Sequence, residues 1–291
     1  MKLLDALGRF ETQMRADGRS PHTVKSYRRH IALLDRWLAS TKRSNDLAAI
    51  DHETLAVFLG SADARTRDDG GPKCAVTVNA LRTALRVFFA YLADADYTPR
   101  NAARLVRRAR CGPPPPRALS DAEIARLRTE LARGHGAATV RDRVLVELLL
   151  ATGVRLSSAL AIDIEDVDLD AGEITLRRVK GDRVQRVFIG RAAHKMLGAF
   201  IGARDRGPLF MGNGFRRYET RHAQRRIADW MRQARIPHAS GHSLRHSFAT
   251  RLYQRTGDVL LVKEALGHRS IESTLVYASA DETRLRQALA T

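Results

Sequence analysis

Apolar side chains recur every three or four residues over most of this chain, which is the period of one face of an α-helix. Ser20 and Pro21 form a helix start, and the helix that follows is predicted to carry one apolar stripe. That stripe consists of Tyr27, Ile31, Leu34 and Leu38, widened by Leu33 and Trp37. A second predicted helix has an apolar face made of Leu81, Leu85, Phe88, Phe89 and Leu92. Residues 1–112 are therefore expected to form an all-helical domain.

The pattern changes in the second half of the chain. The apolar segment from Val144 to Leu150 predicts a buried helix that ends at Thr152-Gly153. Residues 173–179 and 184–189 are rich in Ile, Val, Thr and Phe, which predicts two strands joined by a turn with Lys180 at its tip. From about Ala192 the pattern is helical again, and Gly241, Gly257 and Gly267 are expected to interrupt it.

A run of four prolines, 113–116, separates these two parts. Four prolines favour an extended spacer, since proline fits neither a helix interior nor a central strand. A recognition motif for a partner module is the alternative interpretation. Ser120-Asp121-Ala122-Glu123 then has the pattern of a capping box at a helix start. We therefore predict a first domain over 1–112, a linker over 113–119 and a second domain over 120–291.

The formal net charge of +18 indicates a polyanionic partner, and double-stranded DNA is the first candidate. Arg82 and Arg86 lie four residues apart on the second predicted helix and are predicted to bind DNA, with an ordinary solvated face as the alternative. Cys74 and Cys111 are the only cysteines, which favours free thiols in a reducing compartment. No uninterrupted apolar stretch approaches membrane length, so we expect a cytoplasmic protein that is not in a membrane.

The chemistry-bearing residues of the second half can act on a phosphodiester without a metal. A pair of arginines, a pair of histidines, a lysine and a phenol can together hold a phosphate, attack it and protonate the departing oxygen. These six residues are Arg155, Lys180, His242, Arg245, His268 and Tyr277. Each also has an ordinary interpretation: a packed tyrosine, a solvated lysine, structural histidines and surface arginines. Arg178 and Arg183 lie close enough to Lys180 to compete for its role.

A metal site is a further alternative, because His238, His242 and His246 follow one another at intervals of four residues. The glutamate of a zinc-protease motif is absent, however, and an arginine stands beside the last histidine. We therefore expect no metal and no cofactor.

Five motifs occur in order: Thr152-Gly153-Val154-Arg155, Val179-Lys180-Gly181-Asp182, the segment from His242 to Thr250, Leu266-Gly267-His268 and Ser273-Thr274-Leu275-Val276-Tyr277. In this order they resemble the tyrosine recombinase (phage integrase) family, and in size the chain is most similar to the compact Xer-type recombinases. The resemblance implies a mainly α fold: a helical core-binding domain and a mostly helical catalytic domain with a small antiparallel sheet, closing around DNA as a C-shaped clamp.

The resemblance also implies a role for each residue. Arg155 and Arg245 would bind the phosphate oxygens, Tyr277 would be the nucleophile that forms a 3′-phosphotyrosyl bond, and His242 would be its base. Lys180 would protonate the 5′ oxygen, and His268 would donate a hydrogen bond to the phosphate. Four protomers would act on two DNA duplexes through a Holliday junction. The stretch from Asp281 to Leu289 would dock on a neighbouring protomer, with a frayed terminus as the alternative.

Some positions depart from the family pattern. Ser158 stands where an acidic residue commonly supports the first arginine, Gly241 replaces a frequent proline, and Ala278-Ser279 follow the tyrosine where threonine and histidine are common. The Ser158 change leaves the support of Arg155 open. Two other functions stay open as well: a type IB topoisomerase, and a DNA-binding protein with an inactive site. The sequence does not decide the target DNA, nor whether a second recombinase or an accessory factor takes part.

Overall fold

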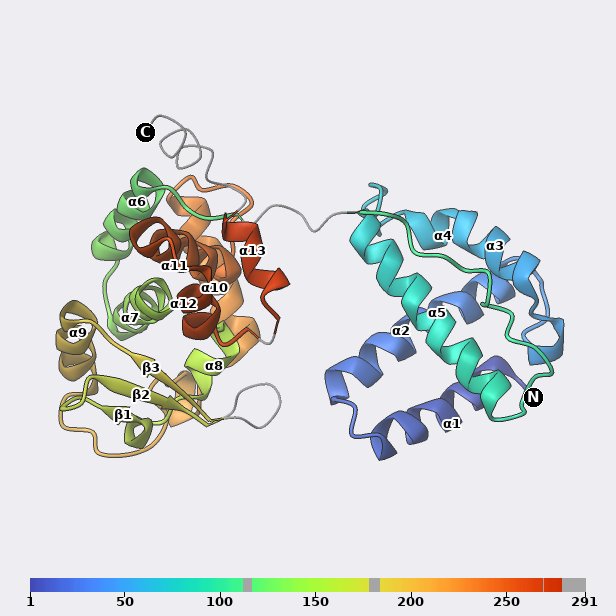
Figure 1. Cartoon of the computed structure of the whole chain (residues 1–291), viewed down its shortest axis with the longest axis horizontal. Coiled ribbons are helices and arrows are strands. Elements are labelled where there is room, and N and C mark those ends of the chain that lie inside the picture. The colour runs from blue at the N-terminus through green and yellow to red at the C-terminus, as the bar shows by residue number, and fades with distance from the viewer. Residues whose placement is uncertain (112–116, 178–183, 269, 279–291) are drawn as a thin grey trace. The chain divides into compact units, whose positions relative to one another are not determined.

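The structure is a computed structural model, and it describes residues 1–111, 117–177, 184–268 and 270–278. The chain divides into two compact units, Met1–Pro114 and Pro115–Thr291, and each is described by itself (Figure 1). Within the described residues the chain is mostly helical, with a three-stranded antiparallel sheet in the second unit. The predicted mainly helical fold with a small antiparallel sheet is confirmed.

The first unit is all-helical in its described part, as predicted. Its elements are α1 (Leu3–Ala16), α2 (Pro21–Ser40), the 3-10 helix η1 (Leu47–Ala49), α3 (His52–Gly60), α4 (Ala62–Arg65) and α5 (Ala75–Asp94). The helix start at Ser20 is confirmed, because its hydroxyl accepts a hydrogen bond from the backbone N–H of Thr23 at 3.2 Å. The stripes of α2 and α5 meet in one core with Phe10 of α1 and Phe58 of α3.

α5 is the helix of the described chain that is long and apolar enough to match a membrane span by composition. Its apolar face is nevertheless used inside the protein, since Leu81, Leu85, Phe88, Phe89 and Leu92 are all buried in the core of the first unit. The helix therefore has the properties of a core helix.

The second unit is built around α7 (Ala137–Thr152), whose apolar residues from Val144 to Leu150 are all buried. α11 (Gly241–Thr256) packs along α7, and α6 (Asp121–Arg133) and α10 (Thr220–Gln233) complete the core. The buried helix predicted from the sequence is confirmed, including its end at a left-handed Gly153. The other helices are α8 (Leu156–Ala161), α9 (Arg191–Ile201), α12 (Val259–Leu266) and α13 (Glu272–Ala278), with 3-10 turns η2 (Ile164–Asp166) and η3 (Asn213–Phe215).

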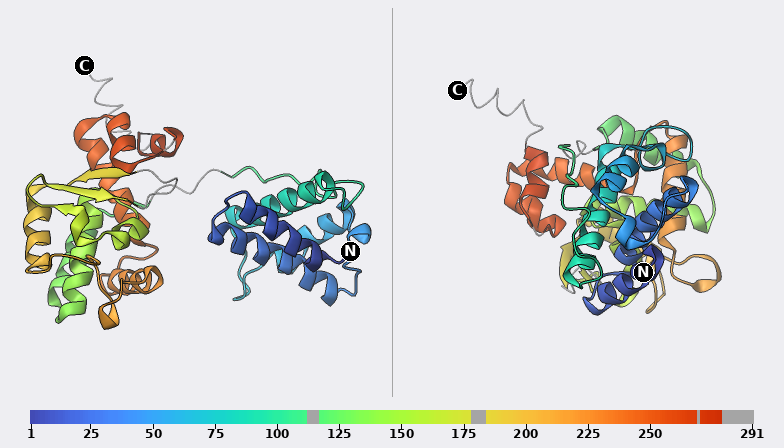
Figure 2. Two further views of the ribbon diagram at one scale, coloured as in Figure 1. Left: turned by 90° about the horizontal axis from the view of Figure 1, so that it is seen from below. Right: turned by 90° about the vertical axis from the view of Figure 1, so that its right-hand side faces the viewer.

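The sheet consists of β1 (Val167–Asp168), β2 (Glu173–Leu176) and β3 (Gln185–Phe188) in that order. β2 and β3 pair in antiparallel register with Ile174 opposite Val187, so the two predicted strands are confirmed and β1 is an addition. Ile174, Leu176 and Val187 face the core, and α9 lies beside the sheet in Figure 1 and in the left view of Figure 2. The turn at residues 178–183 lies outside the described residues.

Gly257 and Gly267 end α11 and α12 in left-handed conformations, as expected of interrupting glycines. Gly241 differs, because it is the first residue of α11, with Ser240 as the cap. The helical pattern is interrupted between α10 and α11, so the expected interruption is confirmed at this helix boundary, where Ser240 caps α11.

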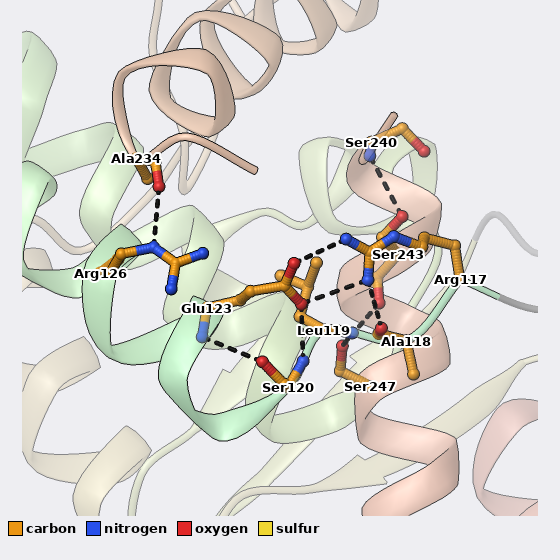
Figure 3. Close-up of polar contacts among 10 residues, drawn as sticks. All are labelled: Arg117, Ala118, Leu119, Ser120, Glu123, Arg126, Ala234, Ser240, Ser243 and Ser247. Atoms are coloured by element: carbon orange, nitrogen blue, oxygen red, sulfur yellow. Dashed lines mark hydrogen bonds and ion pairs between the residues drawn. The ribbon is translucent and has the colours of Figure 1, made fainter. Parts of the chain in front are cut away.

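A polar network fixes the segment that follows the prolines to the second unit (Figure 3). The backbone N–H of Leu119 donates to Ser247 Oγ of α11 at 2.7 Å, and the Ser247 hydroxyl in turn donates to the carbonyl of Ser243 at 2.8 Å. The predicted capping box is confirmed, with Ser120 and Glu123 bonded reciprocally. Arg117 forks onto the Glu123 carboxylate at 2.6 and 3.2 Å. The start of α6 is thereby attached to the helix that carries His242 and Arg245.

Candidate active site

Arg245 is a deeply buried cation of the predicted site. Its side chain enters the protein from α11 and the residue is 6% exposed. Nη1 donates to the carbonyl of Gly153 at 2.7 Å, and Nη2 donates to the carbonyl of Leu266 at 2.8 Å. Both carbonyls belong to helix carboxyl ends, those of α7 and α12, where the helix dipole favours a positive charge. Backbone atoms therefore fix the guanidinium, and part of its five-donor set is left for a ligand.

Glycine is required at both of these helix ends. Gly153 has φ of 64°, and a Cβ added there would lie 2.2 Å from the ring of Phe248. Gly267 has φ of 62°, and a Cβ there would lie 2.5 Å from Oε1 of Gln185 on β3. The carbonyl of Gly153 is one acceptor for Arg245, and Gly267 directly follows Leu266, whose carbonyl is the other acceptor. The two glycines therefore preserve the backbone positions that hold the arginine.

Arg155 lies at the amino end of α8, two residues beyond Gly153. It is half-buried, and in the described part of the chain its side chain has no hydrogen-bond or ion-pair partner. Ser158, at the position of the usual acidic residue, is buried on the same short helix. The pKa of Arg245 is lowered to about 10, mainly by burial and next by the nearby charge of Arg155. Arg245 stays protonated at neutral pH, and the two guanidinium groups repel each other.

Tyr277 lies on α13 and is 4% exposed. Its hydroxyl is 2.7 Å from Nδ1 of His246 on α11. Burial raises the pKa of the Tyr277 phenol, with Arg245 opposing the shift, and burial lowers the pKa of His246, helped by His242 and Arg245. Both shifts favour the neutral forms, so the hydrogen bond joins a neutral phenol and an uncharged imidazole, and the tautomer of His246 decides which of the two donates.

The helix of Tyr277 rests on a separate small core. Tyr277 packs with Ala249 of α11 and with Val262 and Leu266 of α12, apart from the main core of the second unit. A cluster of this size contributes less local stability than the main core does. Tyr277 is therefore held by fewer buried apolar contacts than the helices of the main core are.

His268 follows Gly267 at the end of α12 and is half-buried. Its Nδ1 is 2.8 Å from Oγ1 of Thr274, a fully buried residue one turn before Tyr277 on α13. Burial lowers the pKa of His268 to about 4, and the charges of Arg245 and Arg155 contribute. When the Thr274 hydroxyl donates to Nδ1, the neutral ring has its Nε2–H left to donate.

The other predicted residues have different outcomes. His242 is exposed in the first turn of α11, close enough for its charge to lower the pKa of His246. Lys180 lies outside the described residues, as do Asp281–Leu289 of the tail. His238 precedes α11 with φ of 58°, so it does not share a helix face with His242 and His246. The described residues contain no group of three or more His, Cys, Asp or Glu side chains placed to hold a metal ion.

The structure thus brings Arg155, His242, Arg245, His268 and Tyr277 into one region of the second unit. The positive charges of this region repel one another, since Arg245 and Arg155 each lower the pKa of His268. A bound anion with several oxygens would relieve this repulsion and accept the remaining donors. A phosphodiester has that chemistry.

Arg82 and Arg86 lie on α5 of the first unit, away from its core. Arg86 is exposed, whereas Arg82 is half-buried and donates from Nη1 to Oδ1 of Asn79 at 3.2 Å. Arg86 lines a cavity of about 840 Å³ together with Arg104 and Arg108. Their DNA-binding role stays a prediction.

Comparison with known proteins identifies the family. The model of the phage integrase family matches residues 117–284, and that of the phage integrase N-terminal SAM-like domain matches residues 8–96. Tyrosine recombinase XerC of Serratia marcescens is 32% identical over 268 residues, 90% of this chain and 85% of that protein. XerC of Ralstonia pickettii (strain 12J) is 33% identical over 305 residues, 96% of this chain and 88% of that protein.

Solved structures share the fold. XerH site-specific recombinase, bound to palindromic difH substrate in a post-cleavage complex, has a TM-score of 0.74 at 21% identity, covering 98% of this chain and 83% of that one. A lambda integrase tetramer bound to a Holliday junction has a TM-score of 0.74 at 17% identity, covering 93% of this chain and 78% of that one.

The chain therefore belongs to the phage integrase family of tyrosine recombinases. Its function is site-specific DNA recombination, and it is an enzyme that cleaves and rejoins DNA strands. The resemblance inferred from the five motifs is confirmed, and recombination is favoured over the topoisomerase alternative because the matched relatives are recombinases.

Sequence reasoning missed the groups that surround the predicted residues. His246 was considered only as part of a motif and as a metal ligand, although its place four residues after His242 on one helix was a signal that both face the same region. Thr274 was seen only as part of a motif, although its spacing of three from Tyr277 places both on the inner face of α13. The carbonyls of Gly153 and Leu266 had no signal of their own, because backbone acceptors are not written in side-chain identities.

Proposed function

We propose that Tyr277 is the nucleophile of strand cleavage. Its phenolic oxygen forms a bond to phosphorus while the bond from phosphorus to the 5′ oxygen breaks, which leaves a 3′-phosphotyrosyl link and a 5′-hydroxyl. The phenolic proton passes to a base, and the 5′ oxygen takes a proton from Lys180. The observation that carries the proposal is that the hydroxyl of Tyr277, buried on α13, lies in one region with the buried guanidinium of Arg245.

Arg155 and Arg245 bind the non-bridging oxygens in this proposal. Charge on these oxygens grows in the transition state, and fixed donors aimed at it give the largest catalytic term. Arg245 is supported by two carbonyls and Arg155 has no partner among the described residues, so both have donors to give. His268 donates from Nε2 to the same phosphate, with Thr274 fixing its ring.

His242 is the proposed base, and His246 is the residue that positions the phenol before DNA arrives. Burial keeps the nucleophile neutral, and the hydrogen bond between the Tyr277 hydroxyl and His246 Nδ1 holds it inside the protein. When DNA binds, the Tyr277 hydroxyl would leave His246 and approach the scissile phosphate, which would activate it as a nucleophile.

Substitutions distinguish the proposed roles of His242 and His246. His246→Asn retains a hydrogen-bond acceptor without a basic ring, so we expect near wild-type adduct formation, whereas His246→Phe slows it. His242→Asn is expected to slow it by about 100-fold, the size of a general-base contribution. Single-turnover rates measure this, and a His246→Asn variant as slow as His246→Phe would assign base chemistry to His246 instead.

The wider assembly is also a proposal. The first unit is the core-binding domain over 1–112, residues 113–119 are the linker, and 120–291 form the catalytic domain; together they close on double-stranded DNA as a clamp. Four copies act on two duplexes through a Holliday junction, with or without a second recombinase, and the tail from Asp281 to Leu289 docks between protomers. The protein works in the cytoplasm, where its substrate lies, without a cofactor.

A nicked suicide substrate tests the chemistry. A duplex is first selected from random sequences by its binding to the wild-type protein, and it is then nicked beside the cleavage point so that the short fragment with the new 5′-hydroxyl diffuses away. We expect a covalent protein–DNA adduct that EDTA does not prevent, and we expect Tyr277→Phe to bind the duplex but form no adduct. Binding without any adduct in the wild-type protein would favour a DNA-binding protein with an inactive site.

A further inference from the structure

Arg177 directly follows β2, one residue after Leu176. Lys180, the proposed acid of strand cleavage, comes three residues later, so an extended chain would place it at most about 10 Å from Arg177. Lys180 itself lies outside the described residues. The contacts at the two ends of residues 178–183 therefore decide where the segment that carries the acid begins and ends.

A buried carboxylate holds Arg177 at the first of these ends. Asp166 of η2 is 7% exposed, and its Oδ1 accepts a hydrogen bond from Nε of Arg177. Its Oδ2 accepts from the backbone N–H of Asp163 at 3.1 Å. The hydrogen bond and charge of Asp166 first, and the charges of Glu165 and Asp163 after them, raise the pKa of Arg177 above its usual value. The guanidinium is therefore anchored, although most of the Arg177 side chain is exposed.

The same acidic turn is attached to α8, the helix that begins directly after Arg155. Arg217 donates from Nη1 to the carbonyls of Leu160 at 3.0 Å and Ile162 at 3.2 Å, which lie at the carboxyl end of α8. From Nη2 it donates to Oδ1 of Asp163, the cap residue of η2. A continuous set of hydrogen bonds thus joins the helix of one catalytic arginine to the strand that leads toward the proposed acid.

Ser158, which stands at the position of the usual acidic residue, lies beside this set of hydrogen bonds. Ser158, Asp166 and Arg177 line one small cavity of about 10 Å³. The carboxylate in this lining is that of Asp166. In this chain the acidic group beside Ser158 therefore comes from η2, and it is bound to the side chain that leads into residues 178–183.

The other end of the segment is held by Gln185, the first residue of β3. Its Nε2 donates to the carbonyl of Ala265 on α12 at 3.3 Å. The next residue along α12 is Leu266, whose carbonyl binds Arg245. Residues 178–183 are thus attached on one side to α8 and on the other side to the end of α12, the two helices that support the catalytic arginines.

We propose that Arg177 and Gln185 are positioning residues of the protonation step: they fix the two ends of the segment that carries Lys180, so that its ammonium reaches the 5′ oxygen. In that step the bond from phosphorus to the 5′ oxygen breaks, and a proton moves from Nζ of Lys180 to this oxygen. The inference rests on the proposed function, because it takes Lys180 as the acid. Misplacement of a catalytic group by about 1 Å can cost about 100-fold in rate, so anchors of this kind act on the chemical step as well as on stability.

A nicked duplex with sulfur in place of the bridging 5′ oxygen tests the inference, because a thiol has a pKa of about 8.5 and its thiolate departs without a proton donor. At saturating protein we expect Arg177→Met to slow adduct formation by about tenfold on the oxygen substrate and to stay within about threefold of the wild-type rate on the sulfur substrate. Gln185→Met should show the same pattern with a smaller loss, since its hydrogen bond carries no charge. Arg186→Met is the matched control and should change neither rate, because Arg186 is an exposed arginine of the same sheet with its own carboxylate partner, Glu173 at 3.8 Å.

Combination with Lys180→Ala shows whether Arg177 acts through the lysine. The sulfur substrate should restore Lys180→Ala, and in that background Arg177→Met should slow cleavage of the oxygen substrate by less than about threefold, because the group that it positions is already absent. Equal slowing of Arg177→Met on both substrates, no slowing on the oxygen substrate, or fully additive losses in the double variant would overturn the inference. Failure of sulfur to restore Lys180→Ala would refute the proposed acid and this inference with it, whereas restoration of Lys180→Ala but not of Arg177→Met refutes this inference alone.

Discussion

Replacing Arg245 by lysine keeps the charge and removes the geometry that the structure assigns to this residue. The guanidinium spans two carbonyls, those of Gly153 at 2.7 Å and Leu266 at 2.8 Å, with different nitrogens. One ammonium nitrogen cannot occupy both positions and also donate to a phosphate. Loss of one charge-assisted hydrogen bond costs roughly 1.5–3 kcal/mol of stability. Loss of one fixed transition-state donor costs about 100- to 1,000-fold in rate, or roughly 3–4 kcal/mol.

The assay is single-turnover adduct formation on the nicked duplex at saturating protein, together with a thermal unfolding curve. We expect Arg245→Lys to bind the duplex, to unfold several degrees lower than the wild-type protein, and to form adduct at about one hundredth of its rate or less. Arg255→Lys is the matched control, because Arg255 is an exposed arginine near the end of the same helix. An adduct rate for Arg245→Lys within threefold of the control would refute the reasoning, since charge alone would then be sufficient.

Three further predictions concern stability. Gly153→Ala should destabilise the second unit by more than the 1–2 kcal/mol of left-handed strain alone, whereas Gly214→Ala, with φ of 66° and no atom within 4 Å, should cost only that strain; equal urea midpoints would contradict the close contact. The pKa of His268 falls to about 4 in the folded chain, below its usual 6.5, so proton binding favours the unfolded state and the protein loses stability as pH drops from 6.5 to 4. His268→Gln should remove up to about 3 kcal/mol of that loss of stability. Urea titrations that show the same pH dependence in both proteins would contradict this. Asp142→Ala should cost about 3–5 kcal/mol by leaving Arg141 buried without its carboxylate, and a thermal midpoint within two degrees of wild type would argue against this.

Periodicity was sufficient to predict the helices that form each core. The stripe of α2 and the face of α5 are buried as expected, because a helix of period 3.6 can bury only one face against a neighbour. The capping pair Ser120 and Glu123 is equally local, since both partners lie within one turn. Such features are written in neighbouring residues and can be predicted without knowledge of the tertiary fold.

Long-range polar contacts could not be predicted in this way. Asp142 is 1% exposed and receives hydrogen bonds from Arg226 at 2.8 Å and Trp230 at 3.0 Å, which lie far along the chain on α10. Nothing near Asp142 distinguishes it from a surface carboxylate in the sequence. The order of the motifs identified the candidate residues of the active site, yet the partner of Tyr277, the His246 ring, became apparent only when α13 was seen packed on α11.

The most direct test of the account is to identify the residue that becomes joined to DNA. The covalent adduct is trapped on the nicked duplex, digested with nuclease and protease, and analysed by mass spectrometry for a peptide that carries a 3′-linked nucleotide. The account predicts that the nucleotide is on Tyr277. A nucleotide on another side chain, or linkage through a 5′-phosphate, would contradict it.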